Sequence, residues 1–140
     1  MEYVCDAPDG CTWFRLVTEG EAAQESLAMR HAVEKHFRRE WERAAESFRP
    51  SSSVYIEQDI GKDDYIRRSM PLFLTLRNED GQALATAMLP PGGKRDSNFS
   101  CIIVGEGNSD PYPPYGHAIR ALAEHFGFPL ERSRCFPYRR

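Results

Sequence analysis

One stretch of the sequence, from residue 19 to residue 48, constrains the fold more than any other. Thr18 and Glu21 stand three positions apart, the spacing of a capping box that satisfies backbone N–H groups at the start of a helix. No proline follows until Pro50. Apolar residues recur at spacings of three, four and seven, which places them on one helix face: Ala22, Met29, Val33, Phe37, Trp41, Ala44 and Phe48. The opposite face carries charged residues: Glu25, Arg39, Glu42 and Glu46. We therefore predict one long helix over residues 19–48.

The length of this helix has a consequence for assembly. At 1.5 Å per residue it would measure about 45 Å. A globule formed by a chain of 140 residues should be about 35 to 40 Å across. The helix is therefore expected to overhang, to kink or to pack on a partner, and we predict a homodimer formed through it.

The rest of the sequence predicts a sheet and a second helix. The elements expected, in chain order, are a hairpin over residues 3–16, the long helix, mostly antiparallel strands over 53–104, a C-terminal helix over 114–127 and a tail over 128–140. Gly127 is the residue type that most often ends a helix. Together they predict a single domain, 1–140, of α+β class. In it, an antiparallel sheet of about four to six strands carries the long N-terminal helix and the C-terminal helix.

The composition is that of an ordinary globular protein, with 41% hydrophobic and 28% charged residues, which excludes a largely disordered chain. No apolar run approaches the roughly 20 residues that cross a bilayer, so we expect no membrane partner. Glu2, Asp6 and Asp9 stand where a secretory signal would be basic and then apolar. We expect a cytoplasmic protein whose four cysteines are thiols or metal ligands rather than disulfides.

Cys5, Cys11, His31 and His36 form a possible metal site, because thiolates on a hairpin followed by imidazoles on a helix are zinc ligands. The array resembles a two-Cys two-His zinc finger over the first quarter of the chain. It departs from that pattern in the long gap between Cys11 and His31. On a straight helix, moreover, five residues turn His36 about 140° away from His31. Zinc binding would therefore need a kink, and two ordinary thiols with two unlinked histidines are the alternative.

Three residues near the C-terminal helix, His125, Cys135 and Asp110, are candidates for a small enzyme site, because nucleophilic catalysis needs only spatial proximity. Against this, His125 suits the end of a helix, where a cation is favoured without any catalytic role.

Two further patterns are weaker. The acidic series Tyr55, Glu57, Asp59, Asp63 and Asp64 fits a solvated strand edge and a first helical turn. Residues 105–108, Gly-Glu-Gly-Asn, lack the lysine and hydroxyl residue of a phosphate-binding loop.

The charge distribution argues against nucleic-acid binding over most of the surface, because the formal net charge is −3 and acids and bases are interspersed. The segment Arg132–Arg140 differs, since it combines arginines with Phe136 and Tyr138, which are the residue types that contact phosphates and stack on bases. A tail held by its aromatic residues is the alternative interpretation.

Several runs along the chain resemble those of small uncharacterised bacterial proteins. They are Tyr3 to Pro8, Thr12 to Arg15, His31 to His36, Leu89 to Gly93 and Cys135 to Arg140. The resemblance implies a bacterial cytoplasmic origin, no assigned activity and no site residues.

The sequence alone favours a non-enzymatic interaction or accessory domain that self-associates. The alternatives are a small zinc-stabilised module and a small enzyme with a His/Cys pocket near the C-terminal helix.

Overall fold

The computed structural model describes residues 1–49, 61–135 and 137. Its strands are β1 (Glu2–Asp6), β2 (Thr12–Arg15), β3 (Leu72–Arg77), β4 (Ala83–Leu89) and β5 (Ile102–Gly105). Its α-helices are α1 (Glu19–Met29), α2 (Val33–Ser47), α3 (Lys62–Ser69) and α4 (Tyr112–Phe126). Short 3₁₀ turns are η2 (Pro91–Gly93), η3 (Glu106–Asn108) and η4 (Arg132–Arg134).

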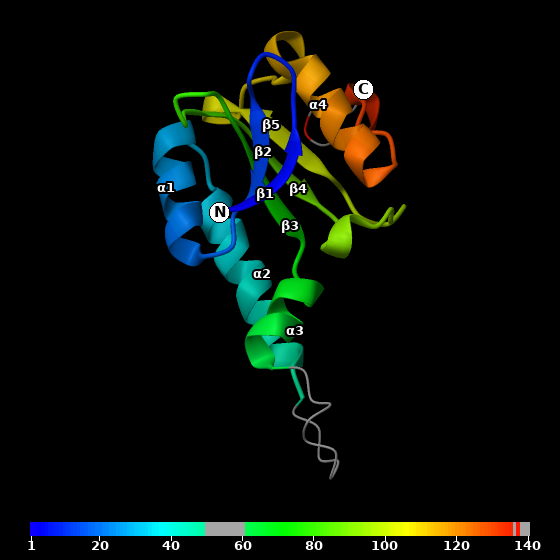
Figure 1. Ribbon diagram of the computed structural model, residues 1–140. Helices are drawn as coiled ribbons and strands as arrows, with labels where there is room; N and C mark the ends of the chain where they lie inside the picture. Colours follow the sequence, from blue (N-terminus) through cyan, green and yellow to red (C-terminus); the bar gives the residue numbers. More distant parts are fainter. Residues whose placement is uncertain (50–60, 136, 138–140) are drawn as a thin grey trace.

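The strands of the described residues form one antiparallel sheet whose order, β1-β2-β3-β4-β5, follows the chain. In Figure 1, α1 and α2 lie on one side of this sheet and α4 on the other. The prediction of an α+β fold built on an antiparallel sheet is confirmed.

The two faces of the sheet follow from the alternation of side chains along each strand. On β3, Leu72, Leu74 and Leu76 belong to the core beneath α4, whereas Phe73 belongs to the core beneath α2 and α3. The α4 core also contains Trp13, which is fully buried and whose indole Nε1–H donates to the Ala118 carbonyl at 2.8 Å. Both faces are therefore covered by helices.

The predicted long helix is wrong in one detail that matters, because the chain leaves helical geometry between α1 and α2. Arg30 adopts the left-handed conformation, with φ of 52°, and caps α1 through its N–H on the Ser26 carbonyl. The Ser26 hydroxyl then accepts from the Glu34 N–H at 2.8 Å and so satisfies a donor in the first turn of α2. Ser26 thus stabilises both helix ends, and two shorter helices fold back on the sheet.

The other elements agree with prediction to different degrees. The predicted first hairpin and C-terminal helix are present, and the predicted antiparallel strand region contains the hairpin of β3 and β4. Thr18 forms the predicted capping box with Glu21. The tail is packed in part, since Phe128, Leu130 and Cys135 are buried. The start of the strand region predicted over 53–104, up to residue 60, lies outside the described residues.

Candidate functional site

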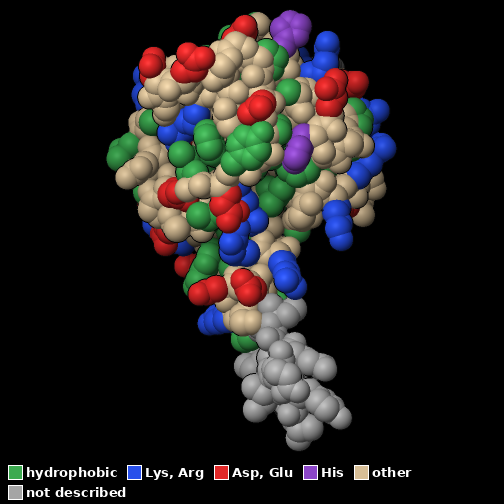
Figure 2. Space-filling model, in the orientation of Figure 1, with side chains coloured by type: hydrophobic (Ala, Val, Ile, Leu, Met, Phe, Trp, Pro, Cys, Tyr) green, Lys and Arg blue, Asp and Glu red, His purple; other side chains and the backbone are tan. Residues whose placement is uncertain are grey.

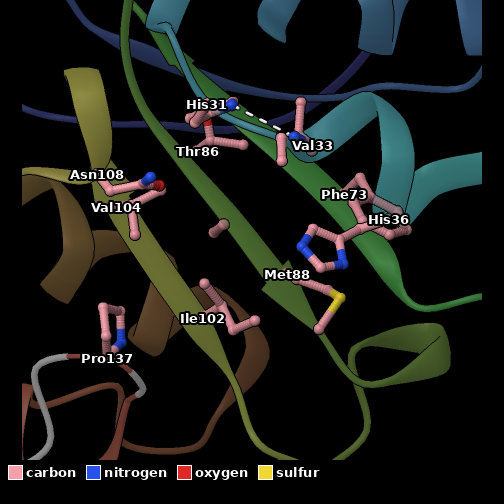
Figure 3. A pocket seen from close by; sticks show the side chains of 12 residues that line it. His31, Val33, His36, Phe73, Thr86, Met88, Ile102, Val104, Asn108 and Pro137 are labelled. Atoms are coloured by element: carbon pink, nitrogen blue, oxygen red, sulfur yellow. Dashed lines mark hydrogen bonds between the residues drawn. The ribbon is translucent and has the colours of Figure 1, made fainter.

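A cavity of about 370 Å³ lies between the beginning of α2 and the strands β4 and β5 (Figure 3). Its floor is apolar and comes from side chains on one face of the sheet: Phe73, Met88, Ile102 and Val104. Its helical wall is formed by residues 31–33 and 36. Ala32 and Asn108 line it and are exposed, so the mouth of the cavity lies beside them.

The break between the helices creates this cavity. His31 stands in the non-helical link, and His36 stands one turn inside α2. A straight helix would direct the two rings about 140° apart, but the left-handed Arg30 resets the direction of the chain, and both histidines line the same space. Figure 3 shows the His36 ring extending into the cavity beside Phe73 and Met88.

A chain of buried and partly buried hydrogen bonds runs from the cavity wall through Glu25 to Arg77. The Thr86 hydroxyl on β4 donates to Oε2 of Glu25 at 2.5 Å and lies 2.8 Å from Nε2 of His31. Glu25 is fully buried on α1, and its Oε1 accepts from Nη2 of Arg77 at 2.7 Å. The guanidinium of Arg77 also donates to the Thr75 hydroxyl and the Gly81 carbonyl. The burial of Glu25 is therefore compensated by a cation and a hydroxyl.

These partners fix the tautomer of His31. The hydroxyl hydrogen of Thr86 is used on Glu25, so Thr86 must accept from His31, whose Nε2 carries the proton. Nδ1 of His31 accepts, at 3.4 Å, from the backbone N–H of Val33. Burial lowers the pKa of His31, and the charges of Glu25 and His36 oppose one another as smaller influences. Both ring nitrogens of His31 are engaged, and the ring is held neutral.

His36 is held differently. Its Nδ1 lies 2.8 Å from Nη2 of Arg39, and because a guanidinium only donates, Nδ1 must be the acceptor. The proton of the neutral ring is therefore on Nε2, which projects into the cavity (Figure 3). Burial lowers the pKa of His36, and the charges of Arg39 and Lys35 lower it further. The cavity thus contains one neutral imidazole N–H directed at its apolar interior.

The Thr86 hydroxyl on this wall is not placed to act as a nucleophile. Thr86 is 4% exposed, and its hydroxyl is committed to Glu25 and His31. A hydroxyl without a free approach cannot attack a substrate. Besides His31 and Thr86, the polar side chains that line the cavity are those of His36 and Asn108.

The four predicted zinc ligands are distributed over the two faces of the sheet. Cys5 is packed in the core beneath α4, with Cys11 against that same core, whereas His31 and His36 line the cavity on the opposite face. Burial raises the pKa of both thiols, which keeps them protonated. No group of three or more His, Cys, Asp or Glu suited to a metal ion occurs in the part of the chain that is described. Zinc binding stays a prediction that this arrangement does not support.

Of the predicted enzyme residues, Asp110 and Cys135 both lie close to Tyr112 at the start of α4, and His125 lies apart from them. Asp110 forms an ion pair with Arg132 and accepts from the Tyr112 N–H at the start of the helix. Cys135 is buried beside Tyr112, and burial raises the pKa of its thiol. His125 is exposed near the other end of α4, about 20 Å along the helix axis from Tyr112, and its ring meets Phe126 edge-on.

The remaining candidates are surface features. Asp63 and Asp64 lie in the first turn of α3, where acidic side chains interact favourably with the helix dipole. Tyr55, Glu57 and Asp59 lie outside the described residues, as do Phe136 and residues 138–140 of the arginine-rich segment. Residues 105–108 end β5 and form η3, where Glu106 pairs with Arg30 at 3.1 Å. Figure 2 shows acidic and basic side chains intermingled over one face of the molecule.

Glu25, Thr86 and Arg77 were not recognised as site residues from the sequence. The pattern placed Glu25 on the solvent face of the long helix, and that expectation is wrong, since its exposure is zero. Its partners are 52 and 61 positions away in the chain. The one available signal was Thr86, a lone hydroxyl among the small apolar residues of β4.

None of the described helices is both long and apolar enough to span a membrane. Comparisons with family models, with curated proteins and with solved structures gave no match for the chain. The resemblance to small bacterial proteins therefore stays a prediction.

Proposed function

We propose that this protein binds a compact, largely apolar small molecule in the cavity between α2 and the strands β4 and β5. The observation that carries the proposal is the composition of the cavity, whose floor is apolar and whose interior receives one oriented imidazole N–H from His36. Small-molecule sites are typically cavities of about 300 to 1,000 Å³ with an apolar lining and a few placed polar groups.

The size of the cavity limits the ligand. At the packing density of protein interiors, about 370 Å³ holds on the order of ten to fifteen non-hydrogen atoms. This corresponds to a substituted single ring or a short branched chain. The buried chain from Arg77 to His31 supports binding indirectly, because it holds the wall of the cavity rigid with a fully satisfied set of hydrogen bonds.

The proposal is tested with a pair of matched tryptophan variants. Ala32 lines the cavity and is exposed, so Ala32→Trp fills the mouth from outside without replacing a core residue. Ala28 is exposed on α1 and is not among the lining residues, which makes Ala28→Trp the control. A panel of mono-substituted benzenes is titrated against the three proteins by calorimetry and by amide NMR shifts.

We expect the parent chain and the Ala28→Trp variant to bind members of the panel at micromolar to millimolar concentration, with shifts centred on residues 86–88 and 102–104. Ala32→Trp should weaken binding about tenfold or more, because the indole occupies ligand volume. Absence of binding to the parent chain by every member, or shifts centred on α4, would contradict the proposal.

The predicted self-association rests on one helix longer than the globule. Since α1 has 11 residues and α2 has 15, that reason no longer applies. Of the large apolar side chains on these helices, Leu27 is 82% exposed and Trp41 is 41% exposed. A homodimer through these helices is the second candidate, and light scattering that finds only monomer at tens of micromolar would exclude it.

A further inference from the structure

The direction of the hydrogen bond at His36 restricts the chemistry of a ligand. A guanidinium has no acceptor, so Arg39 requires the lone pair of Nδ1 and leaves the proton of the neutral ring on Nε2. Nε2 then only donates. A ligand group that meets it must accept a hydrogen bond, as a carbonyl or carboxylate oxygen does and an ammonium does not.

His31 cannot relax this restriction. Its Nε2–H is used on Thr86 and its Nδ1 receives the Val33 N–H, so it offers the cavity neither a free donor nor a free acceptor. The Glu25 carboxylate behind it is fully buried and is bonded to Arg77 and Thr86. The negative charge of the network is thereby neutralised inside the protein, away from the cavity.

The charges around His36 favour an anion. On its own helix, Arg39 and Lys35 are the cations that act on the ring, and Glu40 is the acid. Glu40 is paired with Arg43 at 3.2 Å, which offsets its charge. The sheet contributes Phe73 and Met88 opposite the ring, and neither carries charge. An anionic group at Nε2 would therefore lie near the cations Arg39 and Lys35, and near one acid, Glu40, whose charge is offset by its ion pair.

We propose that the ligand of this cavity is a small apolar monocarboxylate, an inference that rests on the proposed function. Its carboxylate accepts from His36 Nε2–H and its hydrocarbon body lies on Phe73, Met88, Ile102 and Val104. Arg39 serves as a positioning residue, because it fixes the His36 tautomer and places a positive charge behind the ring. A charge-assisted hydrogen bond of this type contributes about 1.5 to 3 kcal/mol, a factor of roughly ten to one hundred in affinity.

The experiment compares four compounds that share one apolar body: 4-tert-butylbenzoate, the corresponding benzamide, the benzyl alcohol and the benzylamine. Each is titrated calorimetrically at pH 7.5 into the full chain and into the His36→Phe and His36→Gln variants. His125→Gln, at an exposed position on α4, is the matched control. Phenylalanine keeps an aromatic ring in place and removes the N–H, whereas glutamine keeps an N–H donor.

We expect the benzoate to bind at least about tenfold more tightly than the benzylamine, with the benzamide and the alcohol between them. His36→Phe should abolish the difference between benzoate and benzylamine. His36→Gln should retain part of it, and His125→Gln all of it. Long-range ¹⁵N–¹H spectra of the parent chain should show the His36 proton on Nε2.

The outcomes separate the two proposals. If none of the four compounds binds and the cavity-filling variant has no effect on other ligands, the proposed function itself fails. If the compounds bind but the benzylamine equals the benzoate, or His36→Phe leaves their ratio unchanged, cavity binding stands and the carboxylate assignment is overturned. A His36 proton found on Nδ1 also overturns the assignment, because the ring would then present an acceptor.

Discussion

The two faces of the sheet are covered in different ways. Beneath α4 an apolar core contains Trp13, whose indole N–H has a backbone partner. Beneath α1 and α2 a second apolar core lies beside a buried ionic chain and an open cavity. The α4 face thus gains stability from the burial of apolar side chains, whereas the cavity face also contains buried polar groups that hold a concave wall. This difference agrees with the proposal that the cavity face binds a ligand, since a binding site needs a rigid concave wall with a few placed polar groups.

The largest effect is expected on the α4 face. Trp13→Ala removes a fully buried indole and leaves the Ala118 carbonyl without its 2.8 Å donor. We expect the free energy of unfolding to fall by about 3 to 5 kcal/mol, measured by urea denaturation. The chain has two tryptophans, and Trp41→Ala is the control because Trp41 is 41% exposed. A loss below about 1 kcal/mol for Trp13→Ala would mean that the core beneath α4 is not a main source of stability.

Glu25 provides the corresponding test of the cavity face. Glu25→Ala leaves the Arg77 guanidinium without its carboxylate and the Thr86 hydroxyl without its acceptor. We expect a loss of about 2 to 3 kcal/mol, below that of a fully enclosed ion pair because Arg77 retains 18% exposure. Glu42→Ala, at an exposed position on α2, should change stability by less than about 0.5 kcal/mol.

The combination of Glu25→Ala with Thr86→Val sharpens the comparison. If the two residues act as one chain, the double variant should lose less than the sum of the single losses, because each single variant already breaks the shared hydrogen bond. Strict additivity would show that the network is not a unit and would remove its role as a rigid wall.

The sequence predicted the elements whose signals are local. The hairpin at Asp9-Gly10, the C-terminal helix ended by Gly127 and the alternation along Leu72–Arg77 all follow from patterns within a few residues. The break after Met29 could not be predicted in the same way, because Met29 and Val33 are both buried and keep the helical spacing across it. Arg30 also gives no sign of a left-handed cap, a conformation that usually signals glycine or asparagine.

The site residues could not be predicted from local sequence patterns for a related reason. A glutamate at a helical position indicates a solvent face unless its partner is known, and the partners of Glu25 are on β3 and β4. The rotation computed for a straight helix separated His31 from His36, whereas the break that unites them depends on a hydrogen bond from the Glu34 N–H to the Ser26 hydroxyl. Contacts between distant segments therefore decide both the cavity and its polar groups.

The smallest expected effect is the change of the unfolding free energy with pH, which again distinguishes the two faces. The folded-state pKa values of His31 and His36 are lowered, chiefly by burial. At a pH between the folded-state pKa values and the unfolded-state pKa of about 6.5, the unfolded chain binds more protons than the folded protein. The stability contributed by the neutral histidines is therefore fully present above about pH 6.5 and falls as the pH decreases. Urea denaturation from pH 7.5 to pH 5.5 should show this loss, and it should be smaller than that of Glu25→Ala.

The cavity histidines should account for that slope. His31→Gln combined with His36→Gln should flatten the dependence of unfolding free energy on pH, since glutamine does not titrate and can still donate to Thr86. His117→Gln on α4 is the control, because His117 is exposed and belongs to the other face. An unchanged slope in the double variant would mean that the two imidazoles are as accessible to protons in the folded protein as in the unfolded chain, which is incompatible with a neutral His36 donor in an apolar cavity.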